Sequence, residues 1–236
     1  MNADQTPFRA GWWSFDLGKY RACNGTYCFF PYESIPPLDQ GLFRGEFQWL
    51  AELDAAHRTQ QEIYDQDDTP HEQLAPRLEQ LRAHAGQLGL SLPESFLKFM
   101  RSGALQDQIP SCTACYFKLG DQIVKSPAGD KGFFLRFLND QQDCILWYLY
   151  LTPAGGHCVV ASPMALDEPD ELPDSAEVIA QHIVYCAPTF EEFIYRFWLE
   201  NTIWFALNEG GNLTEAQKLY LARVVTLLPP SNNPRE

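Results

Sequence analysis

Residues 132–162 read GFFLRFLNDQQDCILWYLYLTPAGGHCVVAS, three apolar runs separated by two short turn-forming segments. The middle run, residues 144–151, has no charged side chain and is rich in aromatic and branched residues, which favours a strand. Alternation along that strand places Trp147 on one face and Tyr148 on the other, so both faces are apolar and both need to be covered. Residues 133–138 and 157–162 flank it across the turns. The stretch therefore predicts an antiparallel meander at the centre of a sheet.

The acidic excess restricts the partners that the chain can bind. Its 236 residues include 17 Lys and Arg against 31 Asp and Glu, a formal charge of −14. Because this charge repels phosphate backbones and anionic lipid, we expect neither nucleic acid nor a membrane as a direct partner. The chain does not open with a basic segment and an apolar core, and no apolar run approaches the ~20 residues of a membrane helix. These features predict a cytoplasmic protein.

The N-terminal part is rich in aromatic residues and is interrupted by Gly and Pro up to residue 43. Asn24-Gly25 is typical of a type I′ turn and predicts a hairpin between residues 19–23 and 26–30. That hairpin would bring Cys23 close to Cys28. Because the total of seven cysteines is odd and a cytoplasmic location favours reduced thiols, we expect free cysteines here and not a disulfide.

Helical periodicity marks five segments. Residues 45–60 form an amphipathic pattern that includes Phe47, and the acidic segment 62–72 follows as a connection. Residues 74–88 and 93–100 come next, the second with a Ser91 to Glu94 capping-box spacing. Thr189 opens a long apolar helix with a similar box, and residues 214–228 form the last helix. In that last helix the residues expected to face inward are Leu219, Leu221, Val224 and Leu228. Residues 114–119 and 178–187 are predicted as further strands.

Together these elements predict an α+β fold, with a central, mostly antiparallel sheet of roughly five or six strands flanked by helices. We expect three parts along the chain. Residues 1–72 form an aromatic-rich extension, a hairpin plus a helix, packed on the core. Residues 73–208 form the core domain, and residues 209–236 form a C-terminal helix and tail.

Residues 88–100, LGLSLPESFLKFM, resemble the signature of the SUKH superfamily, in which such a segment precedes a small sheet and a late helix packs back on it. The resemblance covers roughly residues 74–208 and includes Trp147 in the meander. Members of that family are best known as bacterial immunity proteins that bind and neutralise a toxin of the same system, and others serve as interaction or scaffold domains. The resemblance therefore implies a SUKH-like, non-enzymatic protein-binding module with no catalytic residue. The extension of residues 1–72 departs from the common pattern.

Two cysteine motifs are candidates for chemistry. Cys112 and Cys115 have the C-x-x-C spacing of half a zinc site or of a thiol redox pair. Because a second pair is missing, we expect packed thiols, no bound metal and no cofactor. A metal- or thiol-dependent enzyme using Cys112 and Cys115 remains the alternative. His157 and Cys158 are adjacent on a strand and point to opposite faces, so they cannot act as base and nucleophile.

The most anionic segment is residues 167–177, with six acidic side chains and no basic one. We interpret it as a surface loop, and both solubility and partner binding remain open as its role. Anionic surfaces speed and orient the docking of cationic partners, such as a basic toxin domain. The candidate partner-binding residues are Asp167, Glu168, Asp170, Glu171 and Asp174.

Overall fold

The computed structural model describes residues 1–50 and 71–227, and it confirms the α+β fold. Within the described residues, eight strands form one mixed sheet in the order β2-β1-β8-β7-β6-β5-β3, with β4 paired to β5. The strands are β1 (Arg9–Ser14), β2 (Cys28–Pro31), β3 (Tyr116–Phe117), β4 (Val124–Lys125), β5 (Phe133–Asn139), β6 (Leu146–Leu151), β7 (His157–Ser162) and β8 (Val184–Ala187). The helices are α2 (His71–Gln87), α3 (Glu94–Met100), α4 (Gly103–Gln106), α5 (Ala176–His182), α6 (Phe190–Asn208) and α7 (Glu215–Leu227). The sheet is larger than the five or six strands expected.

The predicted meander is confirmed. Strands β5, β6 and β7 pair antiparallel, and Trp147 in β6 lies opposite Leu138 and Ala161. Every residue of β6 is buried. This burial explains why both faces of the strand are apolar.

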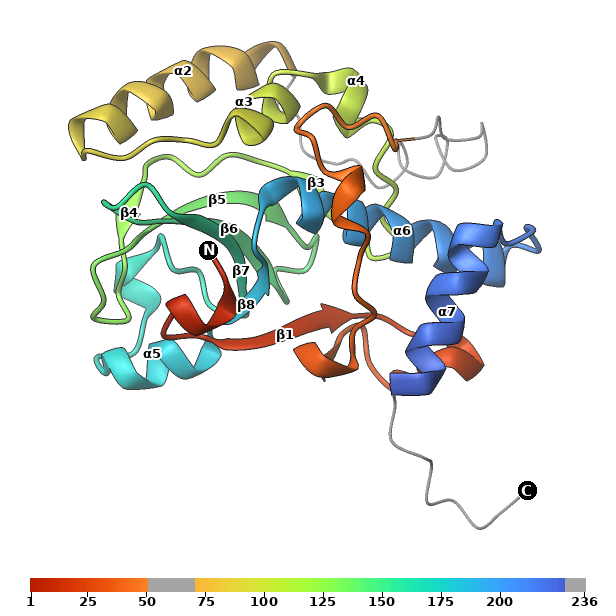
Figure 1. Ribbon diagram of the computed structural model, residues 1–236. Coiled ribbons are helices and arrows are strands. Elements are labelled where there is room, and N and C mark those ends of the chain that lie inside the picture. Colours follow the sequence, from red (N-terminus) through yellow and green to blue (C-terminus); the bar gives the residue numbers. More distant parts are fainter. Residues whose placement is uncertain (51–70, 228–236) are drawn as a thin grey trace.

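Helices cover the two faces of the sheet (Figure 1). Trp147 belongs to the larger core, which also contains residues of α2, α3 and α6. Tyr148 belongs to a second core on the other face, together with Ile179 of α5. In Figure 1, α2 and α3 lie above the sheet and α5 lies below it. No helix among the described residues is long and apolar enough to cross a membrane.

The predicted hairpin between residues 19–23 and 26–30 is wrong. Strand β2 pairs antiparallel with β1, and β1 also pairs in parallel with β8. Neither Asn24 nor Gly25 has the positive φ that a type I′ turn requires. The alternative pairing buries Trp12 against Phe193 of α6, with 5.6 Å between ring centroids. Burial of that large aromatic surface favours pairing over a long sequence distance.

The expectation of free thiols at Cys23 and Cys28 is also wrong, because the two residues form a disulfide. Their Cα atoms are 5.7 Å apart, within the range that a disulfide spans. The loop between the two cysteines brings them together without the predicted turn. The other cysteines, Cys112, Cys115, Cys144, Cys158 and Cys186, are free.

Two helix predictions need correction near their starts. Residues 45–50, the described part of the expected helix 45–60, are not helical, and Phe47 is buried with a positive φ of 54°. The rest of that segment and the acidic connection up to residue 70 lie outside the described residues. Helix α3 begins at the predicted place, but its N-cap is Pro93, without a side-chain hydrogen bond, so Ser91 and Glu94 form no capping box.

The C-terminal half contains two further corrections. Residues 178–187 are not one strand, because Ser175 caps α5 by accepting a hydrogen bond from the Val178 N–H, and only β8 is extended. In α7, Leu221 and Val224 face inward as expected, but the Leu219 side chain is 64% exposed. Position 228 lies outside the described residues. Thr189 caps α6 as predicted, accepting from the Glu192 N–H.

Candidate functional site

The acidic segment, residues 167–177, follows β7 along the chain and runs into the first turn of α5. Its first residue, Asp167, is an anchor. The Nε atom of Arg136, in β5, lies 3.0 Å from Asp167 Oδ2, and the Tyr148 hydroxyl donates to Asp167 Oδ1 at 3.1 Å. The Asp167 side chain is only 7% exposed. Asp167 is thus engaged inside the protein and is not presented to a partner.

The Tyr148 hydroxyl stays protonated beside the Asp167 carboxylate, so the hydrogen bond between them is maintained. Burial, and next the charge of Asp167, raises the pKa of the Tyr148 hydroxyl above its ordinary value. The phenol therefore remains protonated and remains a donor to the carboxylate. The same hydroxyl accepts the Leu166 N–H at 3.0 Å, which ties the backbone before the loop to β6. The root of the acidic segment is held by two strands of the sheet.

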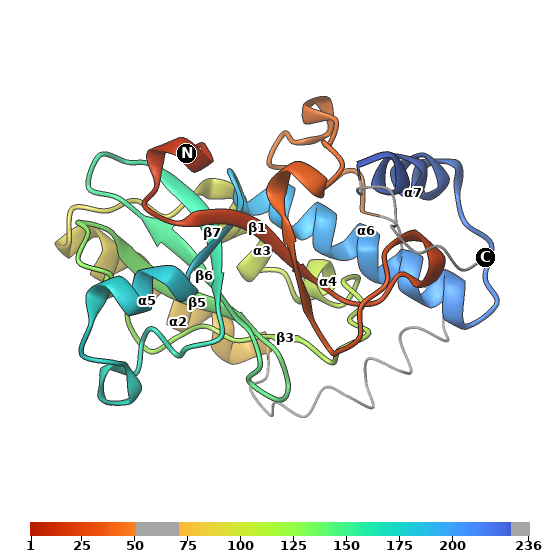
Figure 2. The ribbon, with the colours of Figure 1, turned by 90° about the horizontal axis from the view of Figure 1, so that it is seen from below.

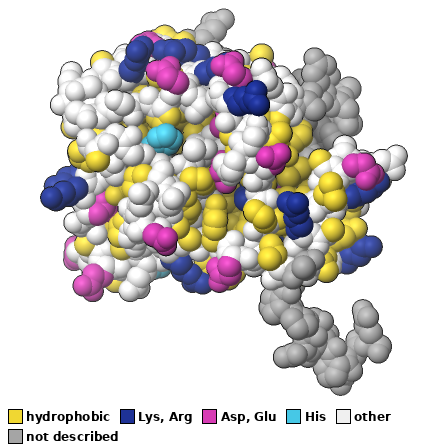
Figure 3. Space-filling model, in the orientation of Figure 1, with side chains coloured by type: hydrophobic (Ala, Val, Ile, Leu, Met, Phe, Trp, Pro, Cys, Tyr) yellow, Lys and Arg dark blue, Asp and Glu magenta, His cyan; other side chains and the backbone are white. Residues whose placement is uncertain are grey.

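The remaining candidates lie on the surface. Glu168, Asp170, Glu171 and Asp174 are all exposed, and a short 3₁₀ helix, Pro169–Glu171, places the first three within one turn. Glu168 is 48% exposed and lies 3.4 Å from Arg136 Nη2. The structure thus separates the five predicted residues into one anchor and four exposed carboxylates. On the face in Figure 3, by contrast, acidic and basic side chains are interspersed.

Cys112 and Cys115 lie in different surroundings. Cys112 packs beside the core formed by α6 and α7, and its N–H donates to Asn201 Oδ1 at 2.7 Å, whereas Cys115 belongs to the main core. Burial raises the pKa of Cys115 to about 11 and that of Cys112 well above its ordinary value. Thiols in this state are protonated at neutral pH and are poor nucleophiles and metal ligands. Across residues 1–50 and 71–227, no three His, Cys, Asp or Glu side chains gather as a metal site would need.

Tyr27 is a polar hub that the sequence did not indicate. Its hydroxyl lies 2.8 Å from both Asp140 Oδ1 and Thr113 Oγ1, and 3.3 Å from Cys115 Sγ. The hydroxyl donates to Asp140 Oδ1. Its ring also packs edge-on against Trp147. These partners lie 86 to 120 positions away along the chain, so local sequence patterns carry no signal for the contact.

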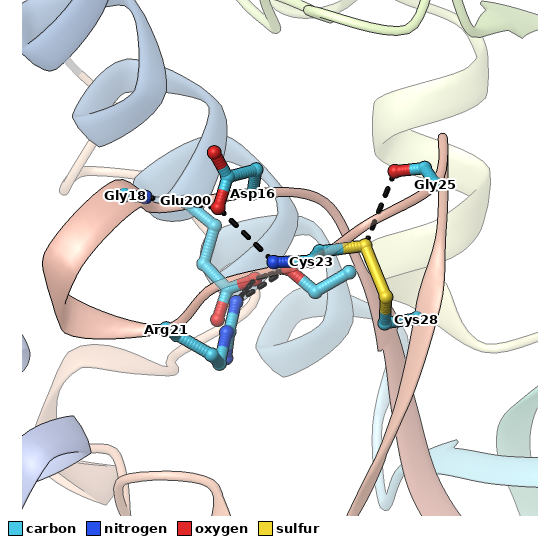
Figure 4. The surroundings of a disulfide bond; sticks show 8 residues. Asp16, Gly18, Arg21, Cys23, Gly25, Cys28 and Glu200 are labelled. Atoms are coloured by element: carbon cyan, nitrogen blue, oxygen red, sulfur yellow. Dashed lines mark hydrogen bonds and ion pairs between the residues drawn. A yellow bond between two sulfur atoms is a disulfide. The ribbon is translucent and has the colours of Figure 1, made fainter. Parts of the chain in front are cut away.

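A second polar cluster is built on Glu200, in α6 (Figure 4). Glu200 Oε2 accepts from Trp12 Nε1 at 2.8 Å and from the Ser14 hydroxyl at 2.6 Å, and it forms an ion pair with Arg21 at 2.5 Å. Glu200 Oε1 accepts from the Tyr220 hydroxyl of α7 at 2.5 Å. All five side chains are buried. The cluster fastens the N-terminal segment to α6 and α7.

Glu191, at the start of α6, likewise holds part of the N-terminal region against this helix. Its buried carboxylate accepts from the backbone N–H groups of Gly45 and Phe47 and from Trp49 Nε1, at 2.5, 3.1 and 3.1 Å. These contacts hold residues 45–49 against the helix and satisfy the donors of a non-helical segment. The carboxylates of both Glu191 and Glu200 are therefore occupied by hydrogen bonds or ion pairs within the fold.

Comparison with known proteins does not identify a relative of this chain. A scan against protein-family models finds no match to this chain, and searches of curated proteins and of solved structures find none either. Among the described residues, the exposed acidic turn on its buried anchor is the feature that most resembles a binding site.

Proposed function

We propose that this chain is a non-enzymatic protein-binding module of the SUKH kind, and that it neutralises a co-encoded bacterial toxin in the cytoplasm. One observation carries the proposal. Four exposed carboxylates, Glu168, Asp170, Glu171 and Asp174, project from a segment whose root is fixed by the Arg136–Asp167 ion pair. The segment itself contains no basic residue, and the basic side chain beside it, Arg136 of β5, lies 3.4 Å from Glu168.

A fixed root matters for recognition. Binding through a mobile loop costs conformational entropy when the loop becomes ordered, and this cost falls when the loop is held in place beforehand. The four carboxylates also create a negative field that attracts and orients a cationic partner. A toxin that holds nucleic acid needs a basic surface, and such a surface is complementary to this turn.

The alternative, a metal- or thiol-dependent enzyme using Cys112 and Cys115, has weaker support. Both thiols are held protonated by burial, and Cys115 is enclosed by Tyr27 and Thr113. A nucleophilic or metal-binding cysteine needs its thiolate and an approach from solvent. We therefore expect Cys112→Ser with Cys115→Ser to leave partner binding unchanged.

The test begins with the partner. Neighbouring open reading frames are expressed singly and together with this chain, and rescue of growth identifies the toxin. Association rates are then compared for the natural chain and for a variant with Glu168→Gln, Asp170→Asn, Glu171→Gln and Asp174→Asn, which leaves Asp167 in place. We expect association to slow about ten-fold at low salt, with the difference shrinking as salt screens the field. Dissociation should change much less.

A matched control removes four exposed carboxylates elsewhere, at Asp4, Glu33, Glu94 and Asp121. It makes the same change in net charge, so a smaller effect on association assigns the steering to the turn. Equal effects of the two variants would place the binding face elsewhere. If no neighbour is toxic and the chain captures no basic partner at low salt, the immunity function is wrong.

A further inference from the structure

The Cys23–Cys28 disulfide closes a small loop at the surface (Figure 4). The three residues after Cys23, namely Asn24, Gly25 and Thr26, are exposed, and both cysteines are half-buried. Reductants in solution can therefore approach the loop. Accessibility is the first requirement for thiol–disulfide exchange.

The ends of this loop are held by contacts that do not involve the disulfide. On one side, the Cys23 N–H donates to Asp16 Oδ1 at 3.1 Å, and Arg21 is fixed by its buried ion pair with Glu200. On the other side, Cys28 lies in β2, opposite Ser14 of β1. None of these contacts requires the disulfide, so we expect the two ends of the loop to stay in place when it opens, while the residues between them lose a restraint.

The reduced form has a hydrogen-bond acceptor already in place. Cys23 Sγ lies 3.1 Å from the carbonyl oxygen of Gly25. In the disulfide this sulfur carries no proton, so the contact is not a hydrogen bond. After reduction the thiol of Cys23 becomes a donor and can use that carbonyl without rearrangement.

The loop also carries Tyr27, directly before Cys28. The Tyr27 hydroxyl lies 3.3 Å from Cys115 Sγ, and its ring packs against Trp147 at 6.1 Å between centroids. Cys115 is 8% exposed. Tyr27 therefore forms part of the cover over the Cys115 thiol, and the disulfide restricts the backbone on which Tyr27 sits.

We propose that the Cys23–Cys28 disulfide is a redox switch, which a cellular dithiol opens without unfolding the chain and whose opening loosens Tyr27 from Cys115. A thiolate of the reductant attacks one sulfur and forms a mixed disulfide, and its second thiol releases the protein. Two electrons and two protons pass to the chain, which gains two thiols, and the dithiol leaves as a disulfide. The switch rests on the proposed cytoplasmic location, where disulfides are mostly transient or redox-sensing, and not on toxin neutralisation.

The test uses the full chain in dithiothreitol buffers of graded reducing strength. Intact mass after alkylation counts the thiols, far-UV circular dichroism reports the fold, and peptide mapping gives the alkylation rate of each cysteine. We expect two thiols to be gained with the fold retained, and Cys115 to be alkylated about ten-fold faster or more after reduction. Cys158 and Cys186, which are fully buried, should stay unreactive, which separates local loosening from unfolding.

Two variants sharpen the test. With Cys23→Ser and Cys28→Ser, Cys115 should react at the faster rate without any reductant. Tyr27→Ala in the oxidised chain should expose Cys115 in the same way, which shows that Tyr27 is the cover. The proposal is overturned if the disulfide resists reduction until the far-UV signal is lost, if the double variant fails to fold, or if the Cys115 rate is the same in both redox states.

Discussion

The carboxylate of Glu200 receives donors from three separate segments: β1, the loop around Arg21, and α7. Burial alone would raise the pKa of Glu200, but the Arg21 guanidinium, helped by hydrogen bonds from Ser14 and Tyr220, lowers it below its ordinary value. Burial of Arg21 acts to lower its pKa, because burial disfavours the charged guanidinium. The negative charge of Glu200, together with its hydrogen bond to Arg21 and the contribution of Tyr220, outweighs this effect, and the pKa of Arg21 is raised above its ordinary value. The pair is ionised because each charge compensates the other.

Glu200→Gln tests this mutual compensation. The change leaves the buried Arg21 charge without a counter-ion, and removal of one partner of a buried pair costs about 3–5 kcal/mol. We expect that loss in the free energy of unfolding, measured by denaturant titration. Glu46→Gln is the control, because Glu46 pairs with Lys98 at the surface and an exposed pair contributes less than about 1 kcal/mol. Equal effects of the two changes would contradict the assignment.

The same group predicts a pH dependence. Because the folded state lowers the pKa of Glu200, its contribution to stability is complete above the unfolded value of about 4.3 and is lost as the pH falls through the lower folded value. Unfolding free energy should therefore decrease below about pH 4.3, and the decrease should be shallower in Glu200→Gln. An identical slope in both proteins would show that folding does not shift the pKa of Glu200.

Trp147 shows what the sequence alone predicts at the scale of one residue. Its place in an uncharged run predicted burial, and the structure leaves it 2% exposed against Phe193, Phe197 and Tyr27. Trp147→Ala removes these contacts and leaves a cavity, so we expect a loss of about 3–5 kcal/mol in the free energy of unfolding. A change below about 1 kcal/mol in denaturant titration would contradict the burial.

At the scale of elements, the sequence predicts best where a pattern is long and local. Strands β5, β6 and β7 and helices α3 and α6 follow from periodicity within a few residues of their observed ends. Strand β1 does not, because its partner β8 is about 175 positions away and nothing in residues 9–14 encodes that pairing. Helix α5 was not predicted because residues 178–187, read as one strand, cover most of a short capped helix and then a strand.

Helix α7 gives an element-scale test of the corrected inward face. Leu221 is 1% exposed in a core with residues of α6, whereas Leu219 faces outward. Leu221→Ala should lower the free energy of unfolding by about 2–5 kcal/mol, because it leaves a cavity. Leu219→Ala should change it by less than about 0.5 kcal/mol, as for other surface positions. Denaturant titration measures the free energy of unfolding of both variants. Similar decreases in the two would mean that the Leu219 side chain is buried.

For the whole molecule, the question is whether residues 1–72 form an extension that the remainder can lose. Strand β1 lies inside the sheet, between β2 and β8, and not at its edge (Figure 2 shows it crossing beside α6). Trp12 and Arg21 reach from this region to Glu200. The N-terminal segment thus completes both the sheet and the buried charge cluster.

Removal of residues 1–43 should therefore prevent cooperative folding. The truncated chain would expose the edge of β8 to solvent. It would also leave the Glu200 carboxylate buried without Trp12, Ser14 and Arg21. Either loss of free energy is large compared with the net stability of a typical domain. In the intact chain we expect one thermal transition, with equal calorimetric and van't Hoff enthalpies. Two separate transitions, or a truncated chain with dispersed amide resonances, would show instead that the core from residue 73 onward folds independently and that the N-terminal segment is an accessory.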